Sequence, residues 1–464
     1  MRLPRDADPF AFGLARIREE FDVPGEFPAE VVAAAEQAAA RRPGADHVDR
    51  TAVEFVTLDP ASARDLDQAF AIERAGDDVV LHYAIADVGF FIRPGDALDH
   101  EAWARGVTVY LPGEKAALYP PVLSEGAASL LPDAPKPAVV FTVLVDTEGD
   151  VRLDGVERAV VRSRAKLAYD TARDDELPPE FAELARRIQR AEQRRDAPRV
   201  DFPEQEIEHS DDGAWRLMFR PRLPSEERNA GMSLATNLAV ADTLHAAETG
   251  LYRVMAEPDE RAIRRLRHTA RAFGFTWPQE HNLLQFQRTL PAGDARSAAF
   301  LIAVRRAGGG ASYERYIEGQ KPWHAAMAAT YAHATAPLRR LADRYVVEAA
   351  LAVANGRPVP NDVQVAFVEL PATMERAESV ANRVDSAVLD LAEAVLLAGR
   401  EGDVFDAVVV DEDVTHDGAA LVQLSDPAVL ARVSAHDVDP GDDVRVKVVA
   451  ADIDARRVEL QRVG

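Results

Sequence analysis

The chain has 464 residues, a hydrophobic content of 47% and a formal net charge of −24, so it can form two or three domains with full-sized cores. It contains no cysteine, which excludes disulfides and thiolate metal sites, and its negative charge argues against a protein that coats nucleic acid through a basic surface. The N-terminal residues lack the layout of a signal peptide, and no apolar run approaches the ~18 residues of a membrane span. We therefore expect a cytoplasmic protein that has no membrane partner.

The N-terminal residues 1–48 are predicted to be a small helical region. The stretch AEVVAAAEQAAARR is rich in alanine and ends in basic residues, as a helix C-terminus prefers, and Pro43 and Gly44 close it. These residues predict a cap that resembles a helix-turn-helix.

An acidic segment follows, TLDPASARDLDQAF, residues 57–70. The residues before it predict a strand that Pro60 ends, and DLDQAFAI alternates like a second strand. At period two, Asp65 and Asp67 would point to the same side, where Asp59 could join them across the loop. Carboxylates this close stay ionised only beside a cation, and hard oxygen ligands suit Mg²⁺ better than zinc or copper. The segment therefore predicts a magnesium site, with an acidic surface loop as the alternative; its spacing excludes an EF-hand.

Residues 49 to about 200 are predicted to alternate strands and loops, and residues 205–400 to be mostly helical. VVLHYAIADVGFFI, residues 79–92, predicts one long buried strand. NAGMSLATNLAVADTLHAAETG, residues 229–250, has helical spacing and a glycine stop.

A second segment with candidate functional residues is HAAMAATYAHATAPLRRLADRY, residues 324–345. Thr335 and Pro337 predict a helix start, whose free N–H groups and dipole would favour an anion. Arg339 would add a planar guanidinium that fits a phosphate bidentately. A helix held by salt bridges is the structural alternative, and His333 is equally consistent with a buried core histidine.

In the last part of the chain the spacing of the hydrophobic residues changes from a helical to a strand-like pattern. The stretch VDSAVLDLAEAVLLAGREG, residues 384–402, predicts a helix with a glycine stop, and short strands with turns at HDG, DP and PGDD follow from residue 404. That pattern and length predict a five-stranded OB barrel over residues 401–464.

Taken together, these motifs resemble the RNase II family, whose nuclease module is the RNB domain. The resemblance covers residues 50–464 in the right order, from the acidic segment through Ala86-Asp87-Val88, YLP and LS to Y.H.T.PLRR..D. It implies an α+β fold: a helical region 1–48, an RNB catalytic domain 49–400 formed by a mixed sheet with packed helices, and an OB-fold RNA-binding domain 401–464.

The resemblance also implies a site and an activity. The activity would be a Mg²⁺-dependent, or Mn²⁺-dependent, hydrolytic 3′-to-5′ exoribonuclease. It would act as a monomer on the 3′ end of single-stranded RNA, with structured RNA as a further candidate, and would release nucleoside 5′-monophosphates. Tyr110 and Phe202 would sandwich the terminal bases, since stacking grips any base; two core aromatics are the alternative. The implied residues are Asp59, Asp65, Asp67 and Gln68 for the metal, Asp65, Asp67, Arg339 and Arg344 for catalysis, and Tyr110, Phe202, Tyr169, Arg340, His333 and Thr335 for RNA.

Four positions depart from the commonest family pattern, and one of them is Ala336, which stands where the family has the serine of its TSP motif. Gln68 stands where a further aspartate is usual, and an amide oxygen can ligate Mg²⁺ without bringing charge. Val347 and Glu348 replace a His-Arg pair, so our hypothesis is that Arg344, one helical turn before Glu348, supplies the missing arginine. DLDQ and TAPLRR together indicate a variant branch that is active.

Two other functions compete with this one. Gln68 and Glu348 are also compatible with a catalytically impaired RNA-binding protein on the same fold, and Mg²⁺-dependent release of mononucleotides would separate the two. A magnesium phosphohydrolase that acts on small phosphates is the third interpretation, and the OB module argues against it.

Overall fold

The computed structural model describes residues 8–132, 134–197, 204–209, 215–220, 222–291, 295–307, 310–412, 419–424, 429–434, 438 and 441–463. Phe202 lies outside the described residues, so its predicted role in stacking bases has no structural counterpart here. None of the described helices combines the length and the apolar content that a bilayer span needs.

A seven-stranded mixed sheet forms the centre of the larger part of the molecule. Its order is β1-β8-β7-β4-β3-β2-β9, with parallel pairing at β1-β8 and β2-β9 and antiparallel pairing elsewhere. Buried valine, leucine and phenylalanine side chains dominate β2, β4 and β7, as expected for strands covered on both faces. The strands are β1 Val48–Asp49, β2 Phe55–Asp59, β3 Gln68–Ala75, β4 Asp78–Ala86, β7 Lys136–Val145, β8 Val151–Val161 and β9 Ser163–Ala168.

Three helices pack on this sheet and on one another. Helix α6, Pro224–Ala246, contacts β4, β7 and β8, while α5, Phe181–Arg194, contacts α6 and β7. Helix α10, Leu341–Ala354, contacts β8 and α6.

Several short elements lie outside the central sheet. The short helices are α3 Val88–Phe91, α4 Ala97–Arg105, a π-helix Leu123–Ala127 and a 3₁₀ helix Ala325–Met327. Two two-stranded sheets pair β5 Val109–Leu111 with β6 Glu114–Ala116, and β12 Leu251–Met255 with β13 Ala311–Arg315.

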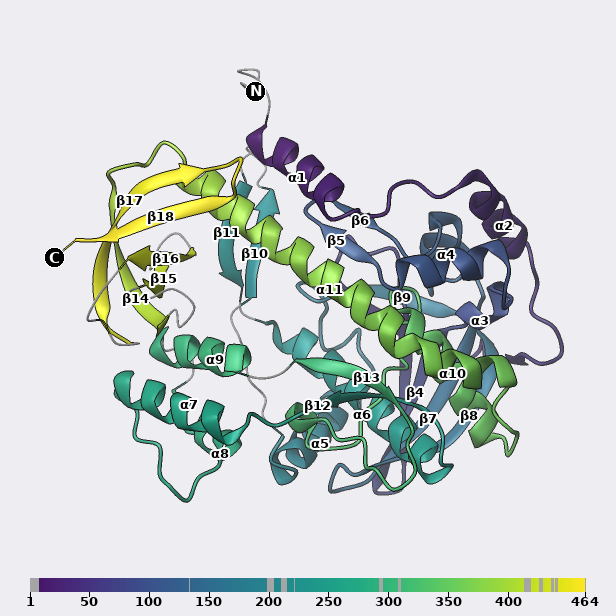
Figure 1. Ribbon diagram of the computed structural model, residues 1–464. Coiled ribbons are helices and arrows are strands. Elements are labelled where there is room, and N and C mark those ends of the chain that lie inside the picture. Colours follow the sequence, from purple (N-terminus) through teal and green to yellow (C-terminus); the bar gives the residue numbers. More distant parts are fainter. Residues whose placement is uncertain are drawn as a thin grey trace.

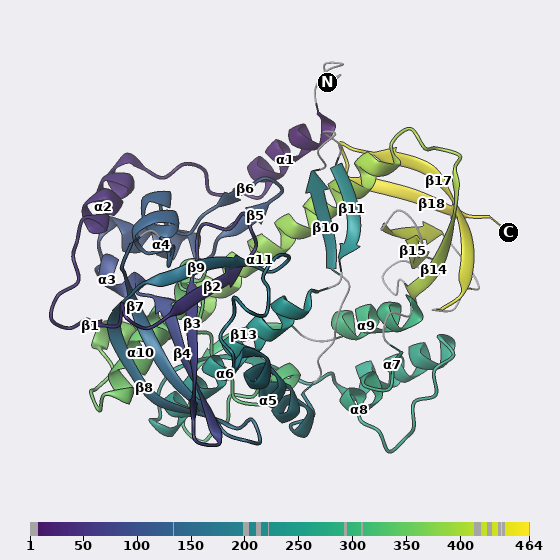
Figure 2. The same ribbon diagram turned by 180° about the vertical axis from the view of Figure 1, so that it is seen from behind.

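The 37-residue helix α11, Asn361–Leu397, links the two ends of the molecule. It runs from α10 across the body to the C-terminal barrel (Figure 1), and Leu397 is buried within the barrel's hydrophobic cluster. Helix α1, Pro9–Glu20, packs along α11, and its Arg16 pairs with Asp454 of the barrel at 2.6 Å. The hairpin of β10 Glu204–His209 and β11 Trp215–Arg220 also packs on α11, between the sheet and the barrel (Figure 2).

The C-terminal barrel is closed, in the strand order β14-β15-β16-β18-β17. Buried aliphatic side chains alternate along its strands and fill the interior. Three helices form a satellite cluster against β14, where Trp277 and Phe286 stack with ring centroids 4.6 Å apart. The barrel strands are β14 Val404–Glu412, β15 Ala419–Leu424, β16 Leu430–Ser434, β17 Asp443–Asp452 and β18 Arg457–Arg462, and the helices are α7 Glu260–Ala272, α8 Leu283–Gln287 and α9 Ala295–Ala307.

The predicted fold class is confirmed: a mixed sheet with packed helices is followed by a five-stranded closed barrel. Several local predictions were wrong. Strand β3 begins at Gln68, so Asp65 and Asp67 lie in the preceding loop. The long strand ends at Ala86, because the Asp87 side chain accepts the Phe90 N–H and starts helix α3. The prediction that residues 205–400 are mostly helical is confirmed, and strands β10 to β13 lie among these helices.

The two N-terminal helices also differ from the prediction. Helix α1 packs on α11, whereas α2, Ala29–Ala39, packs on α4 and on the π-helix. The helices therefore cover different parts of the molecule (Figure 1) and do not form a helix-turn-helix pair.

Candidate active site

A cavity of about 1320 Å³ lies beside the end of strand β2. It is lined by the acidic segment, by the β5–β6 hairpin, by the first turns of α6 and by Arg339. Eight of the lining side chains are acidic and five are basic, so a phosphodiester entering the cavity would meet net negative charge unless a cation is present. The acidic residues are Asp59, Asp65, Asp67, Glu114, Glu125, Glu192, Glu226 and Glu227, and the basic residues are Arg64, Lys115, Arg220, Arg222 and Arg339.

Asp67 joins the two segments that carry the predicted chemistry. Its Oδ1 accepts a hydrogen bond of 2.7 Å from the Leu338 N–H, and its Oδ2 lies 3.5 Å from Arg339 Nε. Burial raises the pKa of Asp67 to about 7, against the opposing effects of Arg339 and of the Leu338 N–H. A buried carboxylate with so high a pKa is one that a bound cation would stabilise in its charged form.

Asp59 is the second buried carboxylate of the cavity. Burial raises its pKa to about 7, the Arg339 charge opposes this shift, and the neighbouring Asp65 charge adds to it. Among the described residues none donates a hydrogen bond to the Asp59 carboxylate. Its oxygens are therefore available to a ligand within the cavity.

Asp65 and Gln68 already have partners. Asp65 Oδ1 lies 2.8 Å from Lys115 Nζ, and Gln68 Nε2 donates to the Thr335 carbonyl oxygen. Gln68 lines the cavity, and its Oε1 accepts no hydrogen bond from the described residues, so this oxygen is free to accept one from a ligand.

The segment around Arg339 is a turn and not the predicted helix start. Helix α10 begins at Leu341, and residues 337–339 form a turn before it. The backbone N–H groups of this turn are occupied: Ala336 donates to Asp343 Oδ2 at 2.8 Å, and Leu338 donates to Asp67. The predicted anion site at a free helix N-terminus was therefore wrong. The Arg339 side chain, 45% exposed, stays a predicted anion-binding group.

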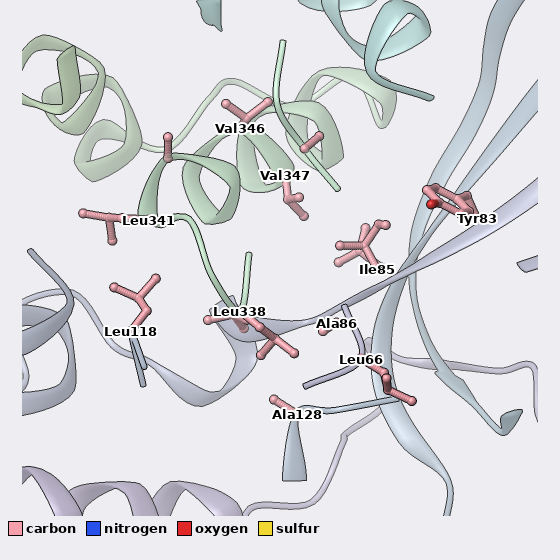
Figure 3. Packing of buried hydrophobic residues seen from close by; sticks show 14 of the residues in the cluster. Leu66, Tyr83, Ile85, Ala86, Leu118, Ala128, Leu338, Leu341, Val346 and Val347 are labelled. Atoms are coloured by element: carbon pink, nitrogen blue, oxygen red, sulfur yellow. The ribbon is translucent and has the colours of Figure 1, made fainter. Parts of the chain in front are cut away.

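Buried leucines next to Asp67 and Arg339 in the chain hold these two residues in place. Leu66, between the two loop aspartates, and Leu338, next to Arg339, are almost fully buried in the same core. Figure 3 shows them beside Ala86, Ala128 and Leu341. Burial of each leucine stabilises the fold by about 1.5–3 kcal/mol, so the polar residues beside them are held by the core.

Two predicted RNA-binding aromatics lie in the cavity. Tyr110 is 48% exposed on strand β5, next to a turn in which Gly113 adopts φ 80°, a conformation that glycine permits. Tyr169 follows β9, and its hydroxyl oxygen accepts a hydrogen bond of 2.9 Å from Asn229 Nδ2. Burial raises the Tyr169 pKa to about 12, so the hydroxyl keeps its proton near neutral pH. Tyr110 is therefore no core aromatic, although its contact with RNA stays a prediction.

Four other predicted residues lie outside this cavity. Thr335 is buried, and its Oγ1 accepts hydrogen bonds of 3.3 Å from Ser233 Oγ and Asn237 Nδ2. His333 Nδ1 lies 2.8 Å from the Tyr313 hydroxyl, and burial lowers the His333 pKa well below its usual value. Arg340 binds both carboxylate oxygens of Asp343, at 3.0 and 2.7 Å, and lines a separate cavity of about 230 Å³. These contacts favour structural roles.

Arg344 is the fourth predicted residue that lies outside the cavity, and its contacts do not support a role as a replacement catalytic arginine. Its side chain is 5% exposed and donates to Asp99 and to the Tyr345 hydroxyl. Glu348, at the position of the missing arginine, pairs instead with Arg158, which also binds Asp87 at 2.9 Å. Both residues hold α10 against the body of the domain.

Sequence reasoning missed several residues of the cavity, of which Lys115 and Asn229 make the most specific contacts. Lys115 is the cross-strand partner of Tyr110 in the β5–β6 hairpin. The dipeptide Pro112-Gly113 between two short apolar runs was an available turn signal that would have paired these residues. Asn229 opens the predicted helix but gave no local sign that it would contact Leu58 and Tyr169.

The donor set fits a hard divalent cation. The described residues contain no preformed group of three acidic or histidine side chains that could hold a metal ion. The cavity nevertheless brings together Asp59, Asp65, Asp67 and Gln68, all oxygen donors, of which Asp59 accepts no hydrogen bond from the described residues. Oxygen-only ligands in a roomy, water-accessible site favour Mg²⁺ or Mn²⁺.

Comparisons with known proteins agree with the fold. The RNB domain matches residues 47–354, and the RNase II-type exonuclease C-terminal S1 domain matches residues 403–463. Ribonuclease R of Aquifex aeolicus is 26% identical over 455 residues, which covers 88% of this chain and 63% of that protein. This chain spans about three fifths of the length of the curated relatives that match most of it.

Solved structures show the same architecture. Mycoplasma genitalium RNase R, in complex with ribose-methylated single-stranded RNA, has a TM-score of 0.88 at 19% identity and covers 98% of this chain and 78% of its own. Yeast Ssd1, described as a pseudonuclease, has a TM-score of 0.71 at 16% identity and covers 95% of this chain and 57% of its own. Because the RNB match covers well over half of the sequence and the S1 match follows it in order, this chain belongs to the RNB-domain family, with an RNase II-type S1 domain at its C-terminal end.

Proposed function

We propose that this chain is a Mg²⁺-dependent hydrolytic exoribonuclease that degrades RNA from its 3′ end and releases nucleoside 5′-monophosphates. The observation that carries the proposal is the position of Asp67, which binds the Leu338 N–H at 2.7 Å and faces Arg339 Nε at 3.5 Å inside the cavity. A metal-binding carboxylate and a phosphate-binding guanidinium are thus close enough to act on one phosphodiester.

Asp59, Asp67 and Gln68 would hold the cation together with Asp65, which would use the carboxylate oxygen that does not contact Lys115. When bound, Mg²⁺ supplies charge neutralisation at the scissile phosphate and a lower pKa for an attacking water. The protein's part is to fix the carboxylates, and the Leu338 N–H does so for Asp67 by occupying one of its oxygens.

Arg339 is the residue that would bind the phosphate. Its terminal guanidinium nitrogens donate no hydrogen bond to the described residues, and only Nε approaches Asp67. A planar guanidinium can donate two parallel hydrogen bonds to phosphate oxygens, which both positions and neutralises the group. Arg339 would therefore stabilise charge that grows on the phosphate during hydrolysis.

Tyr110 and Phe202 would hold the terminal bases by stacking. The exposed Tyr110 ring is available for a base, and stacking gives roughly 1–3 kcal/mol per base without regard to sequence. The Tyr169 hydroxyl accepts from Asn229 and retains its proton, so it can donate to an oxygen of the substrate, and a ribose 2′-hydroxyl is a suitable acceptor.

A catalytically impaired RNA-binding protein is the second candidate. The neutral Gln68 and the Lys115 ammonium on Asp65 both reduce the negative charge available to a metal. Yeast Ssd1 shows that a pseudonuclease shares this fold.

An RNA labelled at its 3′ end distinguishes the two candidates. The proposed enzyme releases a labelled nucleoside 5′-monophosphate as its first product when Mg²⁺ is present and releases nothing in EDTA. A DNA of the same sequence and an RNA with a blocked 3′ terminus serve as controls. RNA binding without any mononucleotide would support the second candidate, and internal fragments as first products would contradict an exonuclease.

A further inference from the structure

Among the described residues, Lys115 makes the shortest ion pair with a predicted metal ligand. The residue lies on β6, and its Nζ is 2.8 Å from Asp65 Oδ1 and 3.0 Å from Glu125 Oε1. The three side chains are only 22%, 14% and 26% exposed, in that order. They line the same cavity as Asp59 and Asp67, so this contact is an internal feature of the site and differs from a surface ion pair.

The register of the β5–β6 hairpin fixes where the ammonium lies. Lys115 pairs across the hairpin with Tyr110, and the neighbouring pairs are Val109 with Ala116 and Leu111 with Glu114. Ala116 and Leu111 are buried, which anchors both strands. A one-residue slip would turn Lys115 out of the cavity, so the packing of the hairpin holds the charge beside Asp65.

The charges of the site have a simple balance. Asp59, Asp65 and Asp67 bring three negative charges when ionised, and Gln68, although it lines the cavity, brings none. The Lys115 ammonium compensates one carboxylate, Asp65, at hydrogen-bond distance. Glu125, the second partner of Lys115, also lies 3.7 Å from Arg64 Nε, which can balance its charge. With Arg339 kept for the phosphate, as the proposed function has it, the buried carboxylates Asp59 and Asp67 remain for a single divalent cation.

We infer that Lys115 is a built-in cation at the candidate active site, where its ammonium replaces a second metal ion beside Asp65, so that the chain binds one divalent cation. The inference deepens the proposed function and rests on it for the use of the site. Glu125 is the second anchor of the ammonium, because its Oε1 lies 3.0 Å from Lys115 Nζ. Lys115 is in this view a positioning residue that sets the number of metal ions.

Mn²⁺ titration of the full-length protein without RNA tests the inference, with bound ions counted by electron paramagnetic resonance and by calorimetry. Wild type should bind one ion per chain. Lys115→Met and Lys115→Gln should each bind two ions, because Asp65 Oδ1 loses the ammonium and becomes free. Circular dichroism checks that each variant is folded, and the second variant replaces the first if one of them misfolds. Lys115→Arg keeps the charge and should bind one.

Lys447→Met is the matched control, because it removes one positive charge from strand β17 of the barrel, and it should also bind one ion. Two ions in wild type, or an unchanged count in both neutral variants, would overturn the inference. Because the titration contains no RNA, its outcome is separate from the proposed function. An inactive protein whose ion count changes as stated would refute only the nuclease, and an active protein whose count does not change would refute only the role of Lys115.

Discussion

Asp67 Oδ1 accepts the Leu338 N–H at 2.7 Å, although the two residues are 271 positions apart in the chain. This one bond attaches the loop before β3 to the turn before α10, and it places the Asp67 carboxylate next to Arg339. Leu338 and Leu66, the neighbour of Asp67 in the chain, are buried in the same core (Figure 3). The chemistry of the site therefore depends on a tertiary contact that is supported by apolar burial.

Tyr110 should contribute to RNA binding through its ring and not through its hydroxyl. Tyr110→Ala should weaken binding of single-stranded RNA by about 5- to 150-fold, the equivalent of roughly 1–3 kcal/mol of stacking. Tyr110→Phe keeps the ring and should stay within about 2-fold of wild type on the same principle. Fluorescence anisotropy with oligonucleotides ending in adenine or uracil measures both. A Phe variant as weak as the Ala variant would show that the hydroxyl makes the contact.

Arg344 should matter for stability more than for cleavage. Arg344→Met removes the charged partner of Asp99, which is 8% exposed and keeps a hydrogen bond of 2.7 Å from the Gly95 N–H. Loss of one partner of a buried ion pair costs about 3–5 kcal/mol. Chemical denaturation measures this loss, and Asp99→Asn combined with Arg344→Met should recover part of it. At a temperature where the single variant is folded, it should cleave RNA within about 3-fold of wild type. Complete loss of cleavage in that folded protein would restore the catalytic hypothesis.

Glu393 should make stability depend on pH. Its Oε1 accepts hydrogen bonds from Leu430 N–H at 2.8 Å and Gln205 Nε2 at 3.1 Å, which tie α11 to the barrel and to β10. Burial raises its pKa from 4.5 to about 7, so between these values the folded state binds a proton that the unfolded state has released. Folding stability should therefore fall as pH rises through this window.

Glu393→Gln removes that titration and keeps an acceptor oxygen. The variant should match wild type near pH 5 and exceed it at pH 8, by at most about 3 kcal/mol. Denaturant melts at the two pH values measure the difference, and the exposed Glu369→Gln on the same helix is the control. Equal stability of wild type and variant at pH 8 would refute the prediction.

Metal binding should also depend on pH, for a different reason. Burial raises the pKa of Asp59 and of Asp67 to about 7, so below that pH protons compete with Mg²⁺ for the carboxylates. The apparent Mg²⁺ affinity should rise from pH 6 to pH 8, with proton release on binding. Calorimetry in buffers of different ionisation enthalpy counts the released protons. An affinity independent of pH would show that these two carboxylates are not ligands.

The sequence predicted what local chemistry determines. Strand β2, helix α6, the last turns of α11 and the five strands of the barrel follow from hydrophobic period, glycine stops and turn residues. The segments that would carry the chemistry were also located, because carboxylates and arginines at these spacings are informative without a structure.

The errors share one physical cause, which is a tertiary partner that local pattern cannot show. Asp65 and Asp67 alternate like strand residues, yet Lys115 and Leu338 draw them into a loop. Thr335 and Pro337 have the chemistry of a helix start, yet Asp343 and Asp67 occupy the N–H groups of that segment. Arg344 has the spacing of a catalytic substitute, yet Asp99, far earlier in the chain, buries it in an ion pair.

The central claim is that Asp67 works as a metal-binding carboxylate opposite Arg339, and Asp67→Asn tests it most directly. The asparagine can still accept the Leu338 N–H and preserve the fold, so only charge is lost. Release of mononucleotides from 3′-labelled RNA in Mg²⁺ should fall by at least about 100-fold, as expected for loss of one oriented electrostatic group, while RNA affinity stays within about 3-fold of wild type. Cleavage at the wild-type rate would contradict the account.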